Sequence, residues 1–164
     1  HEVLSVSRCL VFLPDANGRM ECHYASYLTK DKESILGVAC GLFETYKARL
    51  RQGEQLSFLY SHPETPERTR GLMQEYGIQS VVMTPLVHQE DYQGGICIQQ
   101  CDSEREWSVV EQSMVKAIAN QCAVAIHQSQ LFAQVQQQAQ QEQLLNQIGR
   151  VLNSSLDPDY ILQE

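Results

Sequence analysis

The side chains best suited to chemistry are a cysteine and a histidine that follow one another, Cys22 and His23. Such a pair can supply a thiolate nucleophile or two metal ligands. The pair lies in a run with strand character, however, and consecutive residues of a strand point to opposite faces of a sheet. The six cysteines also contain no CxxC and no zinc-type double pair. The sequence therefore predicts neither catalysis nor a metal site, and we expect reduced thiols.

Noncovalent binding of a small molecule needs only a cleft in which a few polar groups interrupt apolar walls. Two helix-like segments and a proline-containing loop lie between strand-like runs, and together they could enclose such a cleft. Five side chains come from segments that could line it, and they are the ligand-pocket candidates: Tyr60, His62, Tyr76, Met83 and Gln99. No motif in the chain identifies the ligand or a cofactor.

These candidates require a sheet to position them. The strand-like runs come in adjacent pairs at both ends of the domain with helices between them, which indicates an α+β domain with a central antiparallel sheet flanked by helices. Asn17 and Gly18 suit the turn of the first hairpin, and Gly77 suits the left-handed position that ends a helix. The predicted order is strand 8–13, strand 20–26, helix 34–52, strand 55–60, helix 66–76, strand 78–87, strand 94–101 and a long helix.

The long helix is predicted from Glu104 to Ile148, a stretch without glycine or proline. Ser103 and Glu106 have the spacing of a capping box for its first turn. Such a helix extends roughly 65–70 Å, whereas a compact chain of this length has a radius of gyration near ~15 Å. The helix must therefore project, and its apolar stripe needs a partner helix, most simply from a second copy. The residues predicted to face that partner are Met114, Ile118, Cys122, Ala125, Phe132, Val135, Ala139, Leu145 and Ile148.

Charge and composition argue against two kinds of partner. The net charge of −8 argues against nucleic acid, because binding phosphates requires clustered lysine and arginine. No apolar run approaches the roughly 18–20 residues that span a bilayer, and the N-terminus has no signal-peptide pattern. We therefore expect a cytoplasmic protein. Because the first residue is not methionine, we also expect the chain to be part of a longer polypeptide.

The composition changes in the last third of the chain. Residues 134–147 carry eight glutamines and few of the charges that usually set the register of a coiled coil. Asp157 and Pro158 have the pattern of a helix start. We therefore predict a domain over residues 1–133, a Gln-rich helical linker over 134–154, and the start of a following domain over 155–164.

The sequence resembles the GAF domain of cyanobacterial multidomain signalling proteins, such as sensor histidine kinases and phytochrome-like proteins. The resemblance covers residues 1 to about 133 and is most specific between Gly94 and Phe132. Residues 151–162 are similar to the opening of a second GAF domain. The matching segments are Arg8-Cys-Leu-Val-Phe-Leu13, Gly77-Ile-Gln-Ser-Val-Val-Met-Thr-Pro-Leu86, Gly94-Gly-Ile-Cys-Ile-Gln-Gln-Cys101, Arg105-Glu-Trp107, Ile118-Ala-Asn-Gln-Cys-Ala-Val-Ala-Ile126 and Leu131-Phe132.

The resemblance implies a module that precedes histidine kinases, cyclases or phosphodiesterases and that binds a small ligand or chromophore, or only dimerises. Members that tether a bilin use a cysteine, commonly followed by histidine, before the strand that ends here at Leu86. This chain has no cysteine from residue 41 to residue 96, which argues against covalent pigment. The dispersed Asn-Lys, Phe and Asp-Glu pattern of cyclic-nucleotide-binding members has no counterpart here.

The leading hypothesis is a non-catalytic sensory module of a two-component signalling protein. It would form a parallel homodimer through its terminal helices and pass a pocket-linked signal to a downstream output domain. Two alternatives stay open: a dimerisation spacer whose pocket is filled by side chains, and a photosensor whose bilin is held noncovalently or by an unusual attachment.

Overall fold

The computed structural model of the chain describes residues 4–27, 36–37 and 40–155. The chain divides into an N-terminal unit, His1–Val124, and a C-terminal unit, Ala125–Glu164, and each is described by itself. The elements are β1 (Arg8–Pro14), β2 (Met20–Tyr27), α1 (Gly41–Arg51), β3 (Leu56–Leu59), α2 (Glu67–Glu75), β4 (Ser80–His88), β5 (Asp91–Gln100) and α3 (Val109–Ser155). Residues 34, 35, 38 and 39 of the predicted first helix lie outside the described residues.

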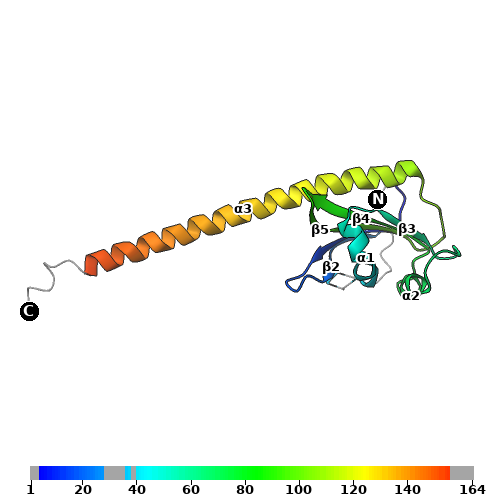
Figure 1. Cartoon of the computed structure of the whole chain (residues 1–164), viewed down its shortest axis with the longest axis horizontal. Helices are drawn as coiled ribbons and strands as arrows, with labels where there is room; N and C mark the ends of the chain where they lie inside the picture. The colour runs from blue at the N-terminus through cyan, green and yellow to red at the C-terminus, as the bar shows by residue number, and fades with distance from the viewer. Residues whose placement is uncertain (1–3, 28–35, 38–39, 156–164) are drawn as a thin grey trace, which may run out of the picture. The chain divides into compact units, whose positions relative to one another are not determined.

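The strands form a five-stranded sheet in the order β2-β1-β5-β4-β3, and every neighbouring pair is antiparallel. This confirms the predicted α+β class. Helices α1 and α2 lie on one side of the sheet and the part of α3 in the N-terminal unit lies on the other (Figure 1). Side chains alternate between the two sides along each strand. On the α3 side, Val82 and Ile98 of the sheet and Ala119 of α3 are buried.

The end of α2 shows how local sequence sets an element's boundary. Gly77 has a φ of 62°, a left-handed conformation that costs glycine little. Its N–H donates to the carbonyl of Gln74, and the N–H of Ile78 donates to the carbonyl of Met73 at 2.7 Å. These two bonds form a Schellman motif, in which Gly77 takes the left-handed position that the sequence predicted for it. The chain then continues into β4. Tyr76, just before this turn, is partly buried against the core between the sheet and α1.

The start of α3 differs from the prediction. The helix begins at Val109, and its capping box is Ser108 with Glu111: the Ser108 N–H donates to Glu111 Oε2 at 2.9 Å, and the Glu111 N–H donates to Ser108 Oγ at 3.2 Å. The predicted box of Ser103 and Glu106 is wrong, because tertiary contacts hold this segment. Glu104 instead accepts the Ser61 N–H at 2.7 Å, and hydrogen bonds from Ser61 lower the pKa of Glu104.

The segment before α3 is also held by an aromatic contact. Trp107 is buried, and the Arg105 guanidinium lies 4.3 Å from the centre of its ring. Arg105 also bonds to Glu111. Hydrogen bonds from Ser108, and to a smaller extent the Arg105 charge, lower the pKa of Glu111. The first turn of α3 is therefore tied to the loop that precedes it.

Removing the cap should weaken this junction. We expect Ser108→Ala to lower the free energy of unfolding by about 1 kcal/mol, because it leaves the Glu111 N–H without its acceptor. Ser103→Ala is the matched control and should change the free energy by less than about 0.5 kcal/mol. Urea denaturation of both variants at one protein concentration measures this. Equal effects of the two substitutions would mean that Ser108 does not cap the helix.

Candidate functional site

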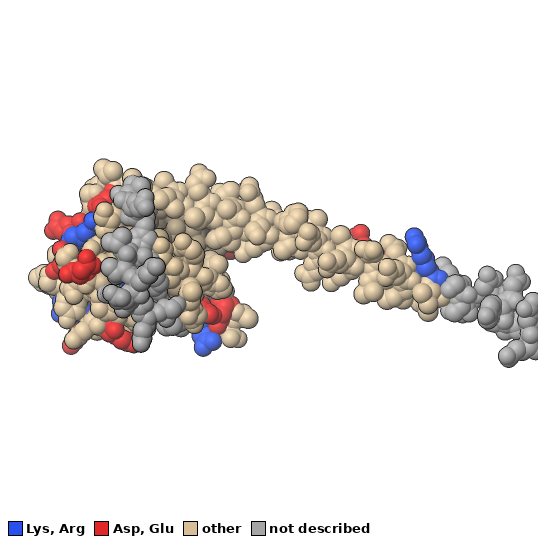
Figure 2. All heavy atoms as spheres, turned by 180° about the vertical axis from the view of Figure 1, so that it is seen from behind, with Lys and Arg blue, Asp and Glu red and all other residues tan. Residues whose placement is uncertain are grey.

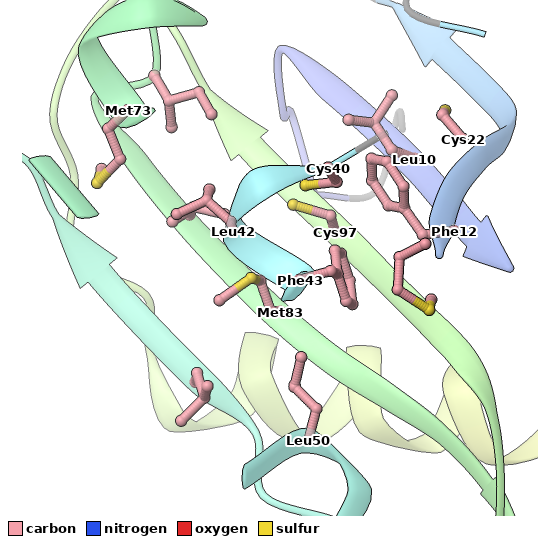
Figure 3. Close-up of a cluster of buried hydrophobic side chains, with 14 residues drawn as sticks. Leu10, Phe12, Cys22, Cys40, Leu42, Phe43, Leu50, Met73, Met83 and Cys97 are labelled. Atoms are coloured by element: carbon pink, nitrogen blue, oxygen red, sulfur yellow. The ribbon is translucent and has the colours of Figure 1, made fainter. Parts of the chain in front are cut away.

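The side of the sheet beneath α1 is filled by apolar side chains. Leu10 and Phe12 of β1, Met83 of β4 and Cys97 of β5 point toward Leu42 and Phe43 of α1 (Figure 3). The strand register sets this row, since Met83 lies opposite Cys97 and Cys97 lies opposite Leu10. Each of these side chains is at most 2% exposed. Within the described residues, this face is therefore a packed core.

Phe43 is the central side chain of this core. A Cβ placed on Gly95 would lie 2.2 Å from Cε1 of Phe43, so only glycine allows the ring to rest on β5. The ring also lies 4.8 Å from that of Phe12, centre to centre. The Phe43 ring thus occupies the space over the middle of the sheet. A flat ligand could not lie there without displacing it.

The five ligand-pocket candidates lie in three places. Met83 is in the core described above. Tyr60 packs at its margin, partly buried. His62 lies apart from them, in an exposed loop beside a shallow surface hollow of about 290 Å³. Tyr76 and Gln99 come together at one polar cluster, which is centred on a residue that the sequence did not single out.

That residue is Arg8, which is 6% exposed. Its Nη1 donates to Gln99 Oε1 at 3.2 Å, and its Nη2 donates to the carbonyl of Tyr76 at 3.0 Å. The charge therefore lies against the C-terminal end of α2, where the helix dipole favours a cation. The sequence offered one sign of this cluster, an arginine at the start of an otherwise apolar strand. The two hydrogen bonds of Arg8 link β1 to β5 and to the end of α2.

The cysteines beneath α1 are poor nucleophiles. Cys40 and Cys97 lie side by side between α1 and the sheet (Figure 3). Burial raises the pKa of Cys40 to about 11 and raises that of Cys97 well above its ordinary value. Both are thiols at neutral pH, and the thiolate is the reactive form. In the Cys22-His23 pair, Cys22 is buried whereas His23 is exposed on the other side of β2.

The residues predicted to form a dimer surface all lie on α3. In the N-terminal unit, Met114 is 37% exposed and Ile118 is 47% exposed. The helix of the C-terminal unit carries most of the exposed large apolar side chains, namely Leu131, Phe132, Val135, Leu144, Leu145, Ile148, Val151 and Leu152. Its only formal charges between Ala125 and Ser155 are those of Glu142 and Arg150, and Figure 2 shows how few charged side chains this helix bears. Within the described residues, no helix combines the length and apolar character needed to cross a bilayer.

The chain is thus a small α+β domain, in which a five-stranded antiparallel sheet has helices on both sides and is followed by a long helix. The family model of the GAF domain matches residues 1–126, and the chain belongs to this family. Membership of the family makes the chain a sensory module and not an enzyme.

Curated relatives of this chain are histidine kinases of cyanobacteria. The chain is 28% identical over 167 residues to the circadian input-output histidine kinase CikA of Thermosynechococcus vestitus, covering 94% of this chain and 23% of the relative. It is also 28% identical over 127 residues to CikA of Synechococcus elongatus, covering 71% of this chain and 17% of the relative. The chain thus spans less than a quarter of the length of these relatives.

Solved structures of similar fold are GAF domains of cyanobacterial photoreceptors. The blue-light-absorbing form of the PixJ GAF domain of Thermosynechococcus elongatus superposes with a TM-score of 0.69 at 16% identity, covering 82% of each chain. The phycocyanobilin-bound GAF domain of a cyanobacterial phytochrome gives a TM-score of 0.68 at 19% identity, covering 78% of each chain. At these identities the likeness establishes the fold alone.

Proposed function

We propose that this chain is the regulatory GAF module of a cytoplasmic signal-transduction protein of the histidine-kinase type. It forms a parallel homodimer through α3 and passes a change in the core beneath α1 to a downstream output domain. Residues 134–154 act as the helical linker, and residues 155–164, largely outside the described part of the chain, begin the following domain. The histidine-kinase relatives support this setting.

The observation that carries the proposal is the exposed apolar surface of α3. Burying a leucine, isoleucine, valine or phenylalanine side chain fully is worth about 1.5–3 kcal/mol. Phe132 is 66% exposed and Leu145 is 67% exposed, so this helix leaves much of that free energy unrealised on its own. A second copy of the same helix can bury these side chains, and a parallel arrangement brings both C-terminal ends to the same output.

Sedimentation equilibrium of the unmodified chain tests the dimer. We expect the unmodified chain to be a dimer at micromolar concentration. The double variant Val135→Glu with Ile148→Glu should be a monomer, because pairing through either position would then bury a carboxylate. The paired control Gln140→Glu with Gln147→Glu adds the same charge to the same helix and should leave the dimer intact. An unmodified chain that stays monomeric at high concentration contradicts the proposal.

A second candidate function is a dimerisation spacer without a ligand, and the packing of Phe43 over Gly95 favours it.

In the sensory alternative, a ligand enters after local rearrangement and contacts Tyr60, Met83, Tyr76 and Gln99. Tyr76 and Gln99 then form the polar end of the pocket. Co-expression with phycocyanobilin synthesis separates the two functions when it is followed by visible absorbance and native mass spectrometry. We expect a colourless chain, because its cysteines beneath α1 are buried thiols. A pigment or other small molecule carried through purification would establish the sensor.

A further inference from the structure

The two edge strands of the sheet, β2 and β3, differ in how the rest of the chain covers them. At the outer edge of β2, the N–H of Cys40 donates to the carbonyl of Met20 at 3.0 Å, so the chain itself occupies part of this edge. The outer edge of β3 is more open. An open strand edge presents N–H and carbonyl groups with which another strand can pair.

The ladder between β3 and β4 determines which groups of β3 face outward. The Tyr60 N–H donates to the carbonyl of Gln79 at 2.9 Å, and residues that bond to the neighbouring strand alternate with residues that face away from it. Ser57 and Leu59 therefore direct their backbone groups away from β4. The Leu59 carbonyl accordingly accepts Thr65 Oγ1 at 2.6 Å. Within the described residues, no hydrogen bond reaches the other three groups, the N–H and carbonyl of Ser57 and the N–H of Leu59.

The loop after β3 lies at the end of this edge and is held by one side chain. Arg70 Nε donates to the carbonyl of Tyr60 at 3.1 Å, and Arg70 Nη2 donates to the carbonyls of His62 and Thr65, each at 3.2 Å. A surface that is already ordered loses little conformational entropy when a partner binds. The edge of β3 and its loop are therefore preorganised for a partner.

Two shallow hollows lie beside this edge. One of about 290 Å³ is lined by residues 57–59 of β3 together with His62, Glu64 and Thr65. The other, of about 360 Å³, is lined in part by Leu59, His62 and residues 104–106 of the loop before α3. Because Leu59 and His62 line both hollows, the two adjoin at the end of β3.

The surface of these hollows is acidic. Glu64, Glu104 and Glu106 are exposed, and within the described residues no salt bridge reaches their carboxylates. Arg105, which also lines the second hollow, is already paired with Glu111. The uncompensated negative charge is complementary to lysine and arginine side chains.

We propose that the outer edge of β3 is a docking site for an extended, basic peptide segment of a partner protein. The segment adds a strand to the sheet by bonding to the outward groups of Ser57 and Leu59, and its lysine or arginine side chains lie over the two hollows. The backbone bonds supply affinity, and the carboxylates select basic side chains. The site does not use the exposed face of α3, so the proposal does not depend on the homodimer.

Two short capped peptides, Thr-Lys-Val-Lys-Thr and Thr-Glu-Val-Glu-Thr, test the site by NMR titration of the full chain labelled with nitrogen-15. We expect the lysine peptide to shift the amide signals of Ser57 and Leu59 saturably and to bind at least about ten-fold more tightly than the glutamate peptide. Equal binding of the two peptides overturns the proposal. Shifts that spare the Ser57 and Leu59 amides also overturn it, because they indicate attraction by charge without strand pairing.

A substitution at Ser57 tests the backbone pairing directly. Ser57→Pro removes an N–H that points away from β4, so the ladder keeps its bonds, and binding of the lysine peptide should weaken by about ten-fold. Ser57→Ala is the matched control, because it keeps the N–H and should bind like the unmodified chain. A folded Ser57→Pro chain that binds with undiminished affinity overturns the proposal.

The charge selection is tested by surface substitutions that leave the backbone of β3 unchanged. Glu64→Gln combined with Glu106→Gln should weaken binding of the lysine peptide by about five-fold. Glu75→Gln combined with Glu90→Gln removes the same charge from exposed positions outside the hollows and should leave the affinity unchanged. Equal effects of the two double variants overturn the proposal, since binding would then follow the net charge of the chain.

Discussion

Phe43→Ala is expected to lower the free energy of unfolding by about 3–5 kcal/mol, because it removes a fully buried ring from the centre of the core. Its neighbours Leu10, Phe12 and Cys97 belong to rigid strands and can close the cavity only partly. Phe43→Leu keeps most of the volume and should cost less than about 1.5 kcal/mol. Urea denaturation of the three chains measures the series. Equal losses for alanine and leucine would mean that ring volume is not what the core requires.

The contact between Phe43 and Gly95 can be isolated by a double-mutant cycle. Gly95→Ala alone should destabilise by about 1–3 kcal/mol, since its methyl group overlaps the ring. In the Phe43→Ala background the same methyl group enters the space that the ring has left, and its cost should largely disappear. Additive effects of the two substitutions would contradict direct contact between the ring and β5.

Arg8→Met should lower the free energy of unfolding by about 2–5 kcal/mol. It keeps most of the length of the side chain but leaves two acceptors without their donor, the buried amide oxygen of Gln99 and the partly buried carbonyl of Tyr76. A buried unpaired acceptor costs about 1–3 kcal/mol, and a partly exposed one costs less. Gln99→Met is the smaller companion change, because the bond to Tyr76 survives it. If Arg8→Met leaves the free energy of unfolding unchanged, the cost of burying the guanidinium equals what its two hydrogen bonds contribute.

The fold was predictable from the sequence where local chemistry decides. The hairpin turn at Asn17 and Gly18 and the end of α2 at Gly77 follow from positive φ values that glycine accepts readily. The start of α3 was not predictable in this way. Ser103 with Glu106 and Ser108 with Glu111 have the same capping-box spacing, and the contact between Glu104 and Ser61, distant in sequence, decides between them.

The candidate site was less predictable because it depends on tertiary packing. Gln99 and Tyr76 were selected from the right segments, but the arginine that joins them comes from another strand. Met83 was selected because its strand could line a cleft, and nothing in the sequence revealed that Phe43 fills the space beside it.

The buried indole beneath the Arg105 guanidinium has a practical consequence, because Trp107 is the chain's only tryptophan. Nearby cations and solvent entry alter the emission of an indole ring, so ultraviolet fluorescence of the unlabelled protein reports on the loop between β5 and the first turn of α3. Any stimulus that repositions this loop can thus be followed optically, in real time and without a dye.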